Sequence, residues 1–67
     1  PLAEVIKVLH RWYNVDFKVE NQDAWNVYFT LTSENTLLEK VLRDLEKIAP
    51  LYFRYDEAEK EVIVTTK

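Results

Sequence analysis

Residues 2–19, LAEVIKVLHRWYNVDFKV, are followed 36 positions later by residues 38–55, LEKVLRDLEKIAPLYFRY. In each stretch, apolar residues at helical spacing give way to the strict alternation that is typical of a strand. The chain therefore contains two helix-then-strand units, and the pattern leaves open whether they arose by duplication or match by chance. The apolar positions that coincide are Leu2 and Leu38, Val5 and Val41, Ile6 and Leu42, Leu9 and Leu45, Trp12 and Ile48, Val15 and Leu51, Phe17 and Phe53, and Val19 and Tyr55.

The first unit predicts a helix over residues 1–13, which Asn14 ends, and a strand over residues 15–20. Residues 21–26 read as a polar connection, and residues 27–33 alternate as a second strand rich in β-forming side chains. The helix has an apolar stripe about 120° wide that is expected to face the core. The stripe consists of Leu2, Val5, Ile6, Leu9, Trp12 and Tyr13.

The second unit predicts a helix that runs to about Ala49, where Pro50 stops it. Thr36 and Glu39 have the spacing of a capping box at its start, and Glu39 can pair with Arg43 one turn later. Two further strands, over residues 51–55 and 61–66, surround a polar turn and form a hairpin. The side chains expected to be buried from this helix are Leu38, Val41, Leu42, Leu45 and Ile48.

The predicted order is α-β-β-α-β-β, an α+β fold in which helices pack against small sheets. Because the second unit has a strand before its helix, the repeat predicts two β-α-β units with the first strand missing ahead of Pro1. We expect residues 1–67 to be a single domain and a fragment of a larger protein, because the chain starts on the first turn of a helix. An open sheet edge would invite pairing with another chain, which allows a dimer.

Composition excludes several classes of site. The chain has no cysteine, so it has neither a disulfide nor a thiolate metal site. It has no glycine, which phosphate-binding loops of the Walker and dinucleotide types require. A net charge of −3 argues against nucleic-acid binding, and no apolar run is long enough to span a membrane.

Two groups of polar residues could suggest catalysis. His10 is the only histidine and has no serine, cysteine or carboxylate pair at helical spacing, so we interpret it as a surface residue. Glu57, Glu59 and Glu61 surround the hairpin turn and could be read as paired acids, but solvation of the turn explains them more simply. We therefore expect no enzyme activity, no catalytic, cofactor-binding or metal-binding residues, and no cofactor.

The large aromatic residues divide into two groups. Trp12 and Tyr13 lie on the apolar helix stripe and are expected to pack in the core. Trp25 lies in a polar connection, while Tyr28 and Tyr52 project from the strand faces opposite Phe29 and Phe53. Because outward-facing aromatic side chains are enriched at protein interfaces, we predict a partner-binding surface made of these three residues: Trp25, Tyr28 and Tyr52.

The opening segment also carries a family resemblance. The pattern Pro1-Leu2-Ala3-Glu4-Val5-Ile6, followed by Arg11-Trp12-Tyr13-Asn14-Val15 and an alternating strand, resembles the C-terminal domain of FecR-like anti-sigma factors. Asn21-Gln22-Asp23 and Leu38-Glu39-Lys40-Val41-Leu42 resemble the turn and second helix of that family. A glycine that is usual in the family after its second strand is absent here.

The resemblance implies a fold related to the short N-terminal signalling domain of TonB-dependent receptors and secretins, with a strand before the first helix. It implies a periplasmic domain of an inner-membrane protein, without membrane contact of its own. Its partner would be the signalling domain of an outer-membrane TonB-dependent receptor, and the signal would pass to a cytoplasmic sigma factor. Two alternatives are that the chain is itself such a receptor or secretin domain, or a small RNA-binding domain with aromatic residues on an open sheet.

Overall fold

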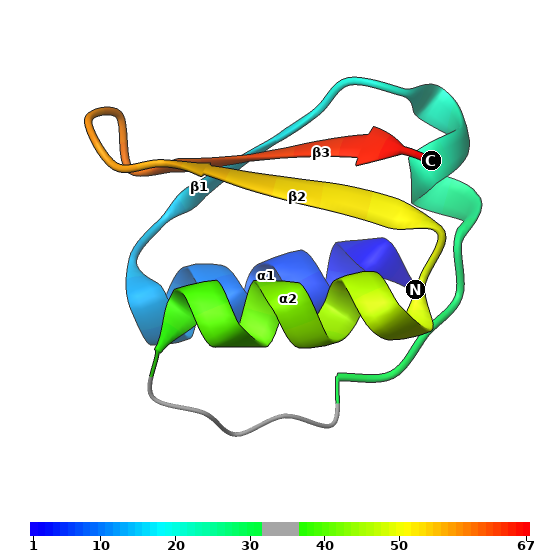
Figure 1. The fold of residues 1–67 in the computed structure, drawn as a ribbon, viewed down its shortest axis with the longest axis horizontal. Helices are drawn as coiled ribbons and strands as arrows, with labels where there is room; N and C mark the ends of the chain where they lie inside the picture. Colours follow the sequence, from blue (N-terminus) through cyan, green and yellow to red (C-terminus); the bar gives the residue numbers. More distant parts are fainter. Residues whose placement is uncertain (32–36) are drawn as a thin grey trace.

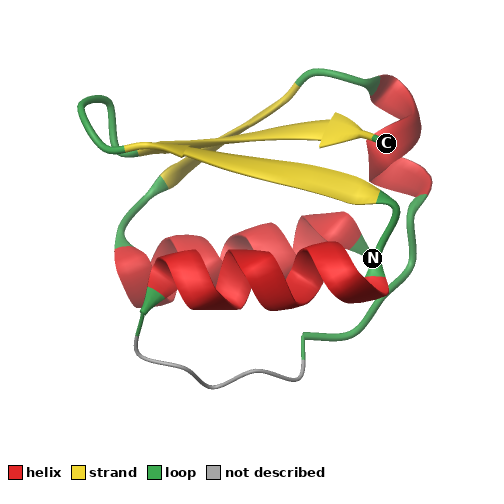
Figure 2. Cartoon of the chain, viewed as in Figure 1, coloured by secondary structure: helices red, strands yellow, loops and turns green. Residues whose placement is uncertain are grey.

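The computed structural model describes residues 1–31 and 37–67. Two helices lie against one face of a three-stranded sheet, and a short 3₁₀-helix lies at one end of the sheet (Figure 1, Figure 2). The α+β class is therefore confirmed. In chain order the elements are α1 (Leu2–Tyr13), β1 (Asp16–Val19), the 3₁₀-helix η1 (Gln22–Asn26), α2 (Leu38–Ile48), β2 (Leu51–Asp56) and β3 (Glu61–Thr66).

The first helix ends as the sequence predicts. Asn14 adopts the left-handed conformation, with φ 54° and ψ 47°, and its N–H donates to the carbonyl of His10 at 2.8 Å. Asparagine tolerates this conformation better than most residues do, which suits a chain that has no glycine. The left-handed turn redirects the backbone from α1 into β1.

The strand order of the sheet is β1-β3-β2. β1 pairs with β3 in parallel, with Phe17 opposite Val62, and β2 pairs with β3 antiparallel, with Phe53 opposite Val64. β1 and β2 therefore run in opposite directions on the two sides of β3. The two helices also run in opposite directions in Figure 1, so each helix-then-strand unit goes out along a helix and returns along a strand.

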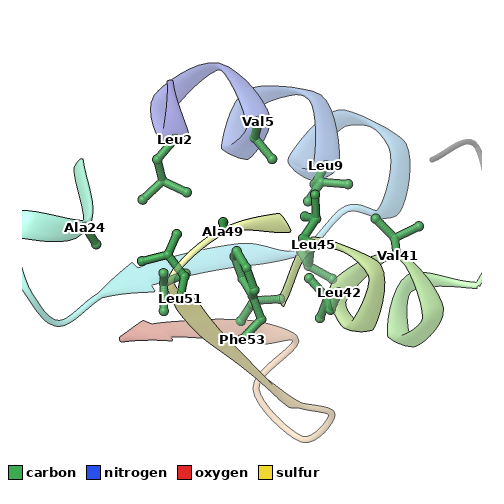
Figure 3. Packing of buried hydrophobic residues seen from close by; sticks show 13 residues of the cluster. Leu2, Val5, Leu9, Ala24, Val41, Leu42, Leu45, Ala49, Leu51 and Phe53 are labelled. Atoms are coloured by element: carbon green, nitrogen blue, oxygen red, sulfur yellow. The ribbon is translucent and has the colours of Figure 1, made fainter. Parts of the chain in front are cut away.

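The core fills the layer between the helices and the sheet (Figure 3). Side chains at equivalent positions of the two units are buried together, such as Leu9 with Leu45 and Val15 with Leu51. The shared apolar pattern of the two units therefore corresponds to a shared pattern of burial. The buried core consists of Leu2, Val5, Leu9, Val15, Ala24, Val41, Leu42, Leu45, Ala49, Leu51, Phe53, Val62 and Val64.

The region between the two units differs from the prediction. The expected polar connection contains the 3₁₀-helix η1, whose Ala24 is fully buried. No strand is assigned in residues 27–31, although Val27 has extended backbone angles; residues 32 and 33 of the predicted strand lie outside the described residues. Alternation indicates a half-buried extended segment, but a strand also needs a hydrogen-bonded neighbouring strand, and no described strand pairs with residues 27–31.

The second helix begins at Leu38, with Leu37 in the N-cap position and no side-chain hydrogen bond from that residue. Thr36, the predicted cap, lies outside the described residues. Arg43 forms its ion pair with Glu46, with 3.3 Å between Nε and Oε1, where the sequence suggested Glu39. The predicted hairpin is confirmed, and Lys60 takes a positive φ of 51° at the entry to β3.

Two predictions about the core are wrong. Trp12 is 49% exposed and Ile48 is 53% exposed, although both were expected to be buried. They lie at the same rim of their helix stripes, and this rim is only partly covered, whereas Leu42 at the opposite rim of the α2 stripe is fully buried. The Trp12 ring makes an edge-on contact with Tyr13, with 6.5 Å between the ring centroids.

Candidate functional site

The three aromatic residues proposed as a partner surface come from three different segments. Trp25 belongs to η1, Tyr28 to the segment that follows it, and Tyr52 to β2. All three are exposed, by 45%, 81% and 54% respectively. Large aromatic side chains this accessible are what a protein partner can bury. No ring-to-ring contact joins them within the described parts of the chain.

Tyr52 is held by a contact within the chain. The Nζ of Lys67 lies 5.4 Å from the centroid of the Tyr52 ring, and the same Nζ donates a hydrogen bond of 2.7 Å to the carbonyl of Glu46. The main-chain N–H of Lys67 also donates to Pro50, at 3.1 Å. The ring is thus oriented in advance at the sheet surface, with a cation over one of its faces.

Trp25 is positioned by the anchoring of η1. Ala24 inserts into the core, and the side-chain oxygen of Asn21 accepts a hydrogen bond of 3.0 Å from the N–H of Thr66. These contacts fix both the first turn of η1 and the end of β3. Trp25 therefore projects from a short helix that is attached to the core on one side and to the sheet on the other.

Sequence reasoning missed the exposure of three further apolar side chains. Trp12 and Ile48 occupy equivalent positions of the two units, and Leu37, just before α2, is also exposed. The repeat could have indicated this exposure, because Trp12 and Ile48 occupy equivalent positions at the edge of their apolar stripes. Periodicity shows which helix face is apolar but not how far a neighbouring layer extends over it.

The molecule also has a groove on its surface. It has a volume of about 260 Å³ and lies between the N-terminal half of α1 and the segment after η1. That segment leaves η1 and passes to the side of the helices that faces away from the sheet (Figure 1). Residues 28–31 make no main-chain hydrogen bond with any described residue. The groove is lined by Pro1, Glu4, Val5, Val8, Phe29, Thr30 and Leu31.

The edge of the sheet at β2 is closed by side chains from α2. The N–H of Phe53 donates to Oε2 of Glu46 at 2.8 Å, and the carbonyl of Phe53 accepts from Arg43 at 2.6 Å. With the ion pair between them, Arg43 and Glu46 present one donor and one acceptor side by side. They occupy the two main-chain groups that an added strand would bind at this position.

His10 and the glutamates of the hairpin turn lie on the protein surface. Nδ1 of His10 lies 2.9 Å from the carbonyl of Val15 and 3.8 Å from Oδ1 of Asp16, and its side chain is exposed. Glu57 and Glu59 lie in the exposed hairpin turn, where the N–H of Glu59 donates to Asp56 at 3.2 Å. Across residues 1–31 and 37–67, no group of three or more acidic, histidine or cysteine side chains could hold a metal ion.

Comparison with known proteins identifies the family. The family model described as FecR, C-terminal matches residues 1–64, which include the described helices and nearly all of the sheet. No curated protein and no solved structure matches the chain significantly. Within the described residues, none of the helices combines the length and apolar character needed to cross a bilayer.

Proposed function

This chain belongs to the FecR C-terminal family, and from that premise we propose that it is the protein-binding domain of a FecR-like anti-sigma factor. The family match over residues 1–64 is the observation that carries the proposal. The domain acts by binding, without catalysis. It is presented in the periplasm by a protein anchored in the inner membrane.

The proposed partner is the N-terminal signalling domain of a TonB-dependent outer-membrane receptor. Binding of that domain, or a change in its contact, would alter how the anti-sigma factor holds its sigma factor in the cytoplasm. The pre-oriented ring of Tyr52 and the anchored position of Trp25 support a rigid docking surface, which loses little conformational entropy on binding. Tyr28, the most exposed aromatic residue, contributes a third side chain that a partner can cover.

Calorimetric titration of this chain with the signalling domain of its receptor tests the proposal. We expect saturable binding that becomes at least about tenfold weaker when Trp25, Tyr28 and Tyr52 are all changed to alanine, because aromatic residues dominate binding energy at interfaces. The matched control changes Trp12 and Ile48 to alanine, since these side chains have similar exposure on the helix face. It should bind like the unmodified chain.

The two possible failures are distinct. If the triple variant bound normally and the Trp12 and Ile48 variant bound more weakly, the partner-binding surface would lie on the helices. The proposed receptor-binding function would still hold. Absence of binding to the receptor domain by the folded, unmodified chain would contradict the proposed function itself.

A further inference from the structure

The free edge of β1 differs from the closed edge of β2. The N–H groups of Asp16 and Glu20 donate to the carbonyls of Lys60, just before β3, and of Val64 in β3. The alternate residues Phe17 and Val19 therefore turn their main-chain groups the other way. No described residue binds the N–H or carbonyl groups of Phe17 and Val19 on that side. β1 is therefore an open edge with its hydrogen-bonding groups exposed in register.

The repeat provides an internal comparison. Phe17 is the equivalent of Phe53, and the residues equivalent to Arg43 and Glu46 are Lys7 and His10. His10 reaches only the carbonyl of Val15, at the start of the strand, and thus leaves Phe17 uncovered. The pair of side chains that closes one edge of the sheet has no counterpart at the other edge.

The side chains of β1 are complementary to a second copy of β1. If two copies pair antiparallel with Phe17 opposite Phe17, Asp16 of each copy lies opposite Lys18 of the other. Val15 then lies opposite Val19. Opposite charges and apolar pairs both stabilise neighbouring strands, and a two-fold axis through Phe17 repeats each contact twice.

We propose that this chain forms a homodimer by antiparallel pairing of β1 with β1 about Phe17. The two sheets then join into one continuous sheet, and the N–H and carbonyl of Phe17 exchange hydrogen bonds with those of the other copy. The Arg43–Glu46 pair prevents the same association through β2. The dimer does not depend on the proposed receptor partner, and its short edge predicts weak association that depends on concentration.

Sedimentation equilibrium and amide hydrogen exchange test the dimer together. As the protein concentration rises, we expect dimer to appear and exchange at the amides of Phe17 and Val19 to slow. Exchange at the amide of Phe53 should not change with concentration, because Glu46 already binds it. A chain that stays monomeric at the highest soluble concentration would overturn the proposal.

Charge exchange tests the register. Lys18→Asp places two like-charged pairs across the axis, so the dissociation constant of the dimer should rise on the order of tenfold. The double variant Asp16→Lys/Lys18→Asp restores opposite charges and should recover dimerisation. Association that is insensitive to Lys18→Asp would contradict this register and with it the proposal.

Introducing the equivalent of the Arg43–Glu46 pair at the β1 edge tests whether such side chains prevent strand pairing. Lys7→Arg/His10→Glu copies the Arg43–Glu46 pair onto α1 and should abolish the dimer. The control Lys7→Arg/His10→Gln also removes His10 but adds no carboxylate, and it should still dimerise. Circular dichroism checks that each variant is folded. Equal dimerisation by the carboxylate variant and its control would show that this edge is not the interface.

Discussion

Trp12 and Ile48 lie at equivalent positions of α1 and α2, and each leaves about half of its side chain exposed, 49% and 53%. Three residues earlier in each helix, Leu9 and Leu45 are buried. The boundary of the core thus falls at the same place in both units. It lies between the centre of the apolar stripe and the one rim that carries Trp12 and Ile48.

This boundary predicts unequal costs for alanine substitutions in α2. Leu45→Ala should lower the free energy of unfolding by about 2–5 kcal/mol, because it removes buried contacts and leaves a cavity. Ile48→Ala should lower it by less than about 1.5 kcal/mol, because half of that side chain is already in water. Urea denaturation followed by circular dichroism measures both values. Equal losses would mean that the rim is as buried as the centre.

The hydrogen bond between Glu46 and Phe53 predicts a local effect at the edge of β2. Glu46→Ala leaves the N–H of Phe53 without its acceptor, which should cost about 1 kcal/mol and accelerate hydrogen exchange at that amide. Glu39→Ala removes an exposed carboxylate from the same helix and serves as the control. Exchange at Phe53 that is equally slow in both variants would show that Glu46 does not protect this position.

The left-handed conformation of Lys60 predicts that glycine stabilises the hairpin. Lys60→Gly should raise the free energy of unfolding by about 0.5–1 kcal/mol, because glycine has no Cβ to strain at positive φ. Lys40→Gly is the matched control in the exposed face of α2, where glycine should lower stability by about 1 kcal/mol. Thermal denaturation of the two variants should therefore shift in opposite directions. A loss of stability at both positions would contradict strain at Lys60.

A row of three carboxylates crosses the outer face of the sheet. Glu61 pairs with Asp16 on one side and with Asp56 on the other, so like charges are neighbours on adjacent strands. Glu61→Lys should raise the free energy of unfolding by about 0.5 kcal/mol at low ionic strength, and high salt should reduce the gain. Glu57→Lys makes the same charge change in the exposed turn, and it should have a smaller effect. An equal increase in the free energy of unfolding at both positions would show that the change in net charge alone causes it.

The sequence predicted most of the regular structure because each of those elements has its own periodicity. Both helices, β1 and the hairpin were predicted close to their observed bounds, and Asn14 and Pro50 marked the helix ends. The predicted strand after η1 was wrong for residues 27–31. Alternation at Phe29 and Leu31 indicates that one side of the segment is apolar, whereas a strand also requires hydrogen bonds to a neighbouring strand. The short helix η1 has too few residues for a period to be visible.

The candidate surfaces were harder to predict than the fold. The exposure of Trp25, Tyr28 and Tyr52 followed from their places outside the apolar stripes, and the structure places all three side chains in contact with solvent. Whether a partner binds them stays a prediction. The Arg43–Glu46 pair at the β2 edge was not foreseen, because its contact with Phe53 depends on how closely α2 packs against β2. The spacing of residues along the chain does not predict the distance between α2 and β2.

The parallel pairing of β1 with β3 has a mechanical consequence. Residues 16–19 lie beside residues 61–64 with both strands pointing the same way, so tension that pulls the first residue of β1 away from the last residue of β3 slides the strands past one another. All hydrogen bonds of that ladder then bear the load at once, whereas the antiparallel hairpin would open one bond at a time. Under force applied at the start of α1 and at the C-terminal end, the load would therefore be carried by the ladder of β1, the shortest of the described strands.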